Sequence, residues 1–272
     1  MDDRIRSLAL AAATGAFVAT PTLGAVFGAG EQTRRYDTVI TPPAYAFWVW
    51  APIFAGAAAS TVAQCRATGR GDPVSRRAGW PLAAAYAANT AWSVAAQSDR
   101  FRYTPYLLPL ATACAATAHI RLQDAGPARG ALALTPASTG LLLGWTALAS
   151  TVNIAAVTVP GKPSHGTVAA CAAGLLAAST ALATGVAASR RGALPFALAA
   201  GWGLLTTALT GSRPRPVRLA AALGATTVAL AAAHASTLSG TGTGTGTRRL
   251  RHLDARRRRH LDRDARRRSR TP

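Results

Sequence analysis

Tryptophan and asparagine recur at helical spacing inside two apolar stretches of the chain. Asn89 and Trp92 lie three residues apart, while Trp145 and Asn153 lie eight apart, so each pair falls on one stripe of a helix. Aromatic rings prefer offset-stacked or edge-to-face contacts with other flat rings, and a few polar groups orient a guest in an apolar pocket. Two apolar helices would therefore each present one tryptophan and one asparagine on a single stripe, which makes these four residues candidates for a binding role.

The densest aromatic run follows the pair Pro42-Pro43 at the start of another apolar stretch. Prolines are well tolerated in the first turn of a helix, so we expect a helix to begin here. On that helix Phe47 and Trp50 share one face, whereas Tyr45 lies on another. The residues singled out by type and spacing are Tyr45, Phe47, Trp50, Asn89, Trp92, Trp145 and Asn153.

These residue types also have structural uses in membranes. Tryptophan and tyrosine gather at membrane interfaces as anchors, which is sufficient to explain Trp48, Trp80, Tyr103 and Tyr106. Asparagine side chains form hydrogen bonds between membrane helices, so the two asparagines could hold a bundle together without touching a ligand. Both interpretations stay open at this stage.

These residues lie in long uncharged stretches, which predict that membrane helices position them. The chain has 272 residues with Lys+Arg 30 and Asp+Glu 10, but the charges gather in short clusters. Because a membrane helix needs roughly 20 mostly apolar residues, we expect an all-α, multi-pass membrane protein and exclude a single soluble domain. The expected spans are about 8–29, 44–65, 79–97, 104–120, 131–154, 167–188, 193–210 and 219–238. The first stretch also fits a cleavable signal peptide.

Arginine dominates the C-terminal end of the chain. Thr-Gly repeats over 240–247 predict a flexible linker, and Arg248 to Arg270 contains 12 arginines. We expect 240–272 to be disordered, and Arg248–Arg270 to bind anionic lipid headgroups at ~1 kcal/mol per arginine or to set orientation alone. Nucleic acid is not expected as a partner, because this tail has no aromatic residue for base stacking. We expect the protein to lie in the cell membrane, and an even number of spans puts both termini on the same side of it. The positive-inside rule predicts that this side is the cytoplasm.

Several function classes lack the residues they need. No acidic side chain lies inside any expected span, which disfavours proton- or sodium-coupled transport, since such proteins usually place a carboxylate at depth. No nucleophile, base and orienting group occur in a recognisable constellation, so we do not expect an enzyme, although an activity on a bound pigment has no sequence test. The isolated cysteines Cys65, Cys114 and Cys171 predict neither a metal site nor a disulfide.

The order of these motifs resembles the tryptophan-rich sensory protein family (TspO/MBR), which includes the translocator proteins, or peripheral benzodiazepine receptors. Family members carry Pro-Pro with an aromatic-x-Phe run and a later Trp, then Asn-x-x-Trp, then Trp with Asn eight residues on. This chain has Pro42-Pro43 with Tyr45, Phe47 and Trp50, then Asn89 with Trp92, then Trp145 with Asn153. The resemblance covers about residues 8–160. It departs at Val39-Ile40-Thr41, where family members usually have a tryptophan, and at Tyr45, where they often have one. These departures concern the ligand more than the fold.

The resemblance implies a five-helix bundle with an apolar pocket that binds a flat ligand and is closed by the loop between the first two helices. Trp50, Trp92 and Trp145 are then the candidate wall of this pocket, with Tyr45 and Phe47 near its mouth. The resemblance also implies a tetrapyrrole ligand, protoporphyrin or haem, with no obligatory cofactor, and a homodimer, for which Gly24-x-x-x-Gly28 and Gly140-x-x-x-Gly144 are weak signals. We therefore predict a TspO-like unit over 1–160, three additional transmembrane helices over 161–239, and the tail over 240–272. The predicted function is that of a membrane-bound sensory or translocator-type protein that binds a hydrophobic ligand. The alternative is an eight-helix transporter for a small hydrophobic solute.

Overall fold

Helices account for nearly all of the chain that can be described. The structure is a computed structural model that describes residues 2–26, 37–98, 100–126, 128–159 and 161–237, and it has no strand within those ranges. The helices are α1 (Asp2–Val26), η1 (Ala44–Val49), α2 (Trp50–Cys65), α3 (Ala67–Arg70), α4 (Pro73–Gln97), η2 (Phe101–Tyr103), α5 (Thr104–Gln123), η3 (Gly130–Ala133), α6 (Leu134–Thr158), α7 (His165–Ala187), α8 (Ala193–Leu209) and a C-terminal helix (Arg215–Thr237). The predicted tail over 240–272 lies outside the described residues.

Each predicted span coincides with one long helix, which confirms the all-α membrane fold. Among the described residues, 5 helical segments are long and apolar enough to cross a membrane: Asp3–Gly24, Ala44–Cys65, Gly130–Thr158, His165–Ala187 and Arg215–Thr237. The other three spans correspond to α4, α5 and the shorter α8. Helix α4 is less apolar on average, but it packs between α1 and α5 and buries most of its residues inside the bundle. The chain is a multi-pass membrane protein.

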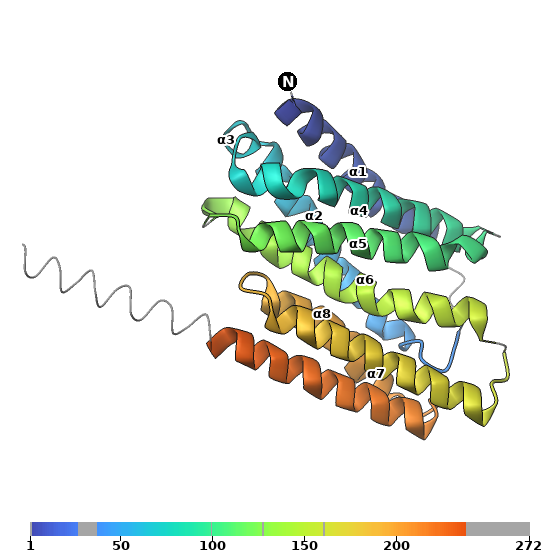
Figure 1. Ribbon diagram of the computed structural model, residues 1–272. Helices are drawn as coiled ribbons and strands as arrows, with labels where there is room; N and C mark the ends of the chain where they lie inside the picture. Colours follow the sequence, from blue (N-terminus) through green and yellow to red (C-terminus); the bar gives the residue numbers. More distant parts are fainter. Residues whose placement is uncertain (1, 27–36, 99, 127, 160, 238–272) are drawn as a thin grey trace, which may run out of the picture.

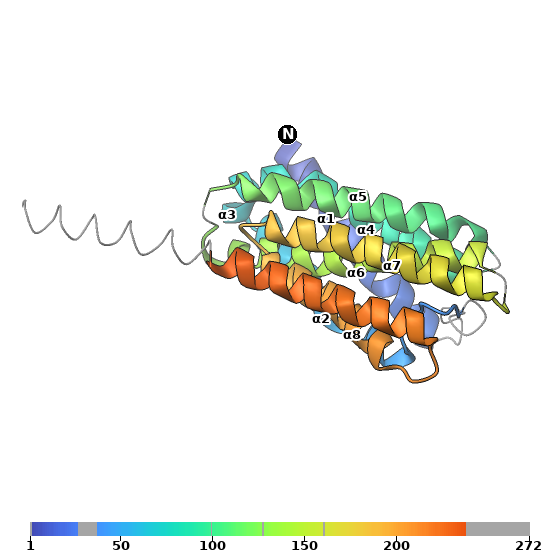
Figure 2. The same cartoon turned by 60° about the horizontal axis from the view of Figure 1, so that its bottom comes forward.

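Five of the helices form a closed ring. Helix α1 packs against α4, α4 against α5, α5 against α6, and α2 closes the ring by contacting both α6 and α1. This is the five-helix bundle that the sequence predicts. Figures 1 and 2 show the remaining long helices side by side on the α6 side of this ring. Both described ends of the chain lie at the end of the bundle that carries α3 (Figure 1), as an even number of spans requires.

Helix α8 joins the additional helices to the ring through a close backbone contact with α6. A Cβ atom at Gly140 would collide with the carbonyl oxygen of Gly192, and one at Gly144 would collide with that of Phe196. The paired glycines therefore let two backbones approach within the chain. Gly192 itself has a left-handed φ of 71°, a conformation that glycine adopts without strain, and this turns the chain sharply from α7 into α8.

The C-terminal helix packs on α7 and α8. Gly224 lies against the side chains of Ser179 on α7 and Leu204 on α8, and Val217 and Val228 are almost fully buried. The three additional helices are thus a layer with its own buried contacts, and α8 connects that layer to the ring.

Charged side chains tie the α3 end of the ring together. Arg6, which is 4% exposed, donates to Asp3 and to the backbone carbonyl of Arg70, and Arg76 donates to the same Asp3 carboxylate at 2.8 Å. These groups lie at the ends of α1 and α4, beside α3. Trp48, Trp80, Tyr103 and Tyr106 are all partly or largely exposed, as the anchor interpretation predicts.

Candidate ligand-binding site

A proline-capped turn carries the aromatic run into the bundle. Thr38 and Thr41 bond to each other through backbone and hydroxyl groups, including a 2.9 Å bond from the Thr38 amide to the Thr41 hydroxyl. Pro43 follows in extended conformation and caps a 3₁₀ helix, η1, instead of the first turn of an α-helix. This segment, Asp37–Val49, is called the entrance segment below. It delivers Phe47 to the interior, while Tyr45 stays half-exposed.

Trp50 is the centre of an aromatic cluster drawn from four helices. Its ring lies 6.3 Å from that of Trp92 in a nearly parallel stack and 6.2 Å from that of Trp145 in an edge-to-face contact, both measured between ring centroids. Phe54 stacks on Trp50 at 5.4 Å, and Phe17 of α1 meets it edge-on at 5.9 Å. These separations fall in the range that aromatic pairs favour.

A hydrogen bond between α4 and α6 fixes two of the candidate residues. The Trp92 indole Nε1 donates to Asn153 Oδ1 at 2.9 Å, and Asn153 Nδ2 donates to the Ala149 carbonyl at 2.9 Å. Both Trp92 and Asn153 are buried. The interhelical role considered for asparagine is therefore confirmed for Asn153. The hydrogen bond described for Asn89 stays within its own helix, from Nδ2 to the Ala85 carbonyl.

Two small cavities flank the Trp50–Trp92 pair. The first has a volume of about 30 Å³ and is lined by Pro42, Phe47, Trp50, Trp92, Trp145, Leu148, Ala149, Val152 and Asn153. The second has a volume of about 50 Å³ and is lined by Phe17, Pro21, Trp50, Phe54, Asn89, Trp92 and Ser93. The first cavity thus brings together five of the seven predicted residues. Asn89 lines the second cavity, and Tyr45 lines neither.

Two residues that line these cavities each have a buried polar atom without a hydrogen-bond partner among the described residues: Nε1 of Trp145 and Oδ1 of Asn89. Trp145 is 2% exposed and Asn89 is 1% exposed. Most buried polar groups in proteins are hydrogen-bonded, so such exceptions require a cause. One is a donor and the other an acceptor, and both belong to the residues that the sequence singled out.

Three aromatic residues in or near the cluster were not selected by the sequence analysis. Phe17 comes from α1, where its surroundings of alanine and valine give no signal of a site. Phe54 lies one helical turn after Trp50, so its shared face was visible in the spacing. Trp202 of α8 makes an edge-to-face contact with Tyr45 at 6.3 Å, a pairing of distant segments that spacing cannot reveal.

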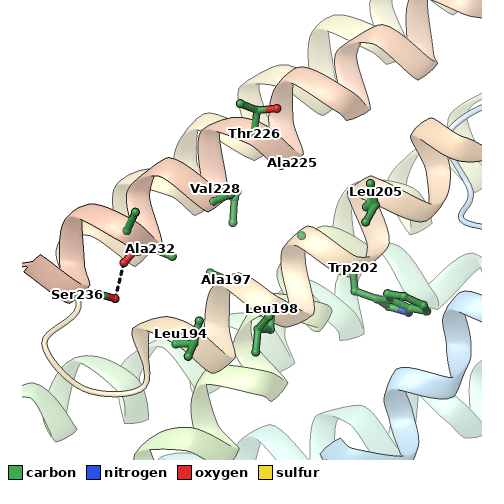
Figure 3. Close-up of a pocket in the computed structure, with 13 residues that line it drawn as sticks. Leu194, Ala197, Leu198, Trp202, Leu205, Ala225, Thr226, Val228, Ala232 and Ser236 are labelled. Atoms are coloured by element: carbon green, nitrogen blue, oxygen red, sulfur yellow. Dashed lines mark hydrogen bonds between the residues drawn. The ribbon is translucent and has the colours of Figure 1, made fainter.

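Larger hollows lie outside the ring but are open grooves. One of about 610 Å³ runs between α8 and the C-terminal helix (Figure 3). Its two hydroxyl side chains bond within their own helix, Ser236 to the Ala232 carbonyl at 2.9 Å and Thr226 to the Ala222 carbonyl at 3.0 Å. Another, of about 520 Å³, lies along α5, α6 and α7. None of the seven predicted residues lines either groove.

Comparison with known proteins identifies the family. A family model described as TSPO-like protein matches residues 8–234, whereas no curated protein and no solved structure matches the chain. The matched stretch contains the three tryptophan and asparagine motifs and continues through α7, α8 and most of the C-terminal helix. With its five-helix ring and its motifs in the expected order, the chain belongs to the family of TSPO-like proteins.

Proposed function

We propose that this membrane protein binds a flat, hydrophobic tetrapyrrole, protoporphyrin or haem, at the cluster of Trp50, Trp92 and Trp145. The observation that carries the proposal is the convergence of these rings from α2, α4 and α6 around two cavities inside the ring. The tetrapyrrole class comes from the resemblance to tryptophan-rich sensory proteins. Binding rather than turnover is the proposed activity.

Aromatic walls suit a planar guest better than a flexible one. A macrocycle can replace one ring of a stacked pair and keep the favourable offset geometry that Trp50 now shares with Trp92 and Phe54. The two unpartnered atoms offer orientation, because Trp145 Nε1 can donate to a carboxylate and Asn89 Oδ1 can accept from a pyrrole N–H. A few placed polar groups in an apolar pocket are typical of ligand sites.

A guest of this size requires the cluster to open. Ligand pockets typically measure about 300–1,000 Å³, far more than the 30 and 50 Å³ of the two cavities. Trp50 lines both cavities and is only half-buried, whereas Trp92 is anchored by its bond to Asn153. Displacement of the Trp50 ring would merge the cavities, so we assign Trp50 as the side chain that moves and Trp92 and Trp145 as the fixed walls.

The remaining expectations complete the proposal. We place the protein in the cell membrane with both termini in the cytoplasm, where the Arg248–Arg270 segment faces anionic headgroups, each arginine contributing ~1 kcal/mol. A homodimer remains a proposal, and the Gly140 and Gly144 contacts within the chain remove one of its two sequence signals.

A titration with protoporphyrin tests the proposed function. When the wild-type protein in detergent is titrated with protoporphyrin, the absorption of protoporphyrin should shift and the shift should saturate at one protoporphyrin per protein. Trp92→Ala combined with Trp145→Ala should weaken binding by at least 100-fold. The matched control is Trp80→Ala combined with Trp48→Ala, which removes two exposed indoles and should leave the affinity unchanged. Equal affinity in the pocket variant and the control would remove the assignment of the site.

A further inference from the structure

We propose that α8 acts as a latch on the candidate site: Trp202 and Arg213 hold the entrance segment closed over the tryptophan cluster and control access of the guest. This inference rests on the proposed function for its guest and concerns a part of the chain outside the predicted TspO-like unit. It assigns Trp202 and Arg213 as positioning residues, because neither lines either cavity of the cluster.

The first connection is a hydrogen bond from α8 to the entrance segment. Trp202 Nε1 donates to the carbonyl oxygen of Ala46 at 2.8 Å, and the Trp202 ring meets Tyr45 edge-to-face. Figure 3 shows this indole pointing from α8 toward the blue ribbon and away from the C-terminal helix. Ala46 is fully buried. The bond therefore attaches the entrance segment to α8 at the residue before Phe47, which lines the first cavity.

The second connection lies at the other end of the entrance segment. Arg213, just after α8, makes a bidentate ion pair with Asp37 at 2.7 and 3.0 Å and donates to the Thr38 carbonyl at 2.7 Å. The Arg213 side chain is only 14% exposed, and charge-assisted bidentate contacts are the strong class of hydrogen bonds. Between these two attachments lies Pro42, which also lines the first cavity.

Helix α8 packs closely on α6, and this packing is the base of the latch. Gly203, next to Trp202, lies so close to Leu148 and Trp145 that a Cβ would contact both. The glycine contacts of α6 with α8 add a backbone-to-backbone attachment along the same pair of helices. An outward movement of the entrance segment therefore has to break the Trp202 and Arg213 contacts, since α8 cannot follow it.

Hydrogen exchange of the ligand-free protein tests the latch directly. The Ala46 amide donates to the Pro43 carbonyl and the Thr41 amide to the Thr38 carbonyl, so both amides report opening of the segment. Trp202→Phe keeps an aromatic ring but removes the donor, and Arg213→Gln removes the ion pair. Trp202→Phe should speed exchange at Thr41 and Ala46 about 3- to 10-fold, the effect of one lost hydrogen bond. Arg213→Gln, which weakens or removes three charge-assisted bonds, should speed exchange by at least as much, and the two changes together by more. Trp80→Phe, which removes an exposed indole elsewhere, is the control and should have no effect.

Guest kinetics provide the second readout. In stopped-flow mixing, Trp202→Phe should raise the association and dissociation rate constants of protoporphyrin by similar factors and change Kd less than twofold. Unchanged exchange in both variants would overturn the latch, and so would faster exchange with unchanged guest rates. Arg213→Gln decides the question if Trp202→Phe does not fold. Absence of protoporphyrin binding to wild-type protein would overturn the proposed function, and exchange in the ligand-free protein would then decide the latch alone.

Discussion

The bond between Trp92 and Asn153 gives the sharpest prediction of how the site is built. Trp92→Phe keeps a ring but removes the donor, which leaves Asn153 Oδ1 buried without the 2.9 Å bond it now accepts. Asn153→Leu leaves the Trp92 N–H without its acceptor instead. Removing one partner of a buried hydrogen bond costs about 1–3 kcal/mol, whereas replacing both by apolar groups can be nearly neutral. The double variant should therefore be more stable than the sum of the single changes predicts.

The size of this coupling follows from where the bond lies. Hydrogen bonds between membrane helices average about 0.6 kcal/mol and reach about 1.7 kcal/mol in double-mutant cycles. Both residues are less than a tenth exposed, and Asn153 is further oriented by its bond to Ala149. We therefore expect a coupling free energy of about 1–1.5 kcal/mol, in the upper half of that range.

Denaturant unfolding in detergent micelles, followed by circular dichroism, measures the cycle. A control cycle pairs Asn153→Leu with Trp80→Phe, whose residue lies about 18 Å along α4 from Trp92 at 1.5 Å per residue, and should give no coupling. A Trp92–Asn153 coupling below about 0.3 kcal/mol, the usual error of additivity, would refute the reasoning that this bond joins α4 to α6.

Three further predictions concern packing. Gly144→Leu should destabilise the protein by at least about 2 kcal/mol, because the new side chain overpacks against α8. Gly174 has open space around it, so Gly174→Leu should change the unfolding free energy by under about 0.5 kcal/mol. Thermal melts of both variants in detergent measure the difference. Trp50→Ala should merge the two cavities, so free indole should raise its melting temperature but not that of wild type, and equal shifts would contradict the shared wall. Truncation after Val159 should give aggregated protein on size-exclusion chromatography, because it uncovers α6 and the back of Trp145; a monodisperse remnant would show that α8 is dispensable for the ring.

Helix positions were predictable because charge breaks delimit them. Arginine clusters and Pro-Gly segments bound each apolar stretch, so the predicted spans and the observed helices agree to within a few residues at most ends. The start of the second span was less predictable. Pro43 is extended before Ala44, and the chain then forms a 3₁₀ helix, which contacts α8, before the α-helix begins.

The site was predictable as a set of residues but not as a geometry. Spacing placed Trp92 on one stripe with Asn89, and Asn153 on one stripe with Trp145. It could not pair Trp92 with Asn153, because which stripe of α4 meets which stripe of α6 depends on the packing of the whole ring. Phe17 gave no signal at all, since a single phenylalanine among small residues is ordinary for a membrane helix. Trp202 escaped selection because its role depends on a contact with Ala46 across 156 residues of sequence.

The absorption spectrum of the protein purified from membranes of its host tests the central claim most directly. Wild-type protein should carry a Soret band that survives size-exclusion chromatography, and the Trp92→Ala, Trp145→Ala variant at equal yield should lack it. A pigment-free wild-type protein that also fails to take up added protoporphyrin, or an undiminished band in the variant, would contradict the claim that these tryptophans hold a tetrapyrrole.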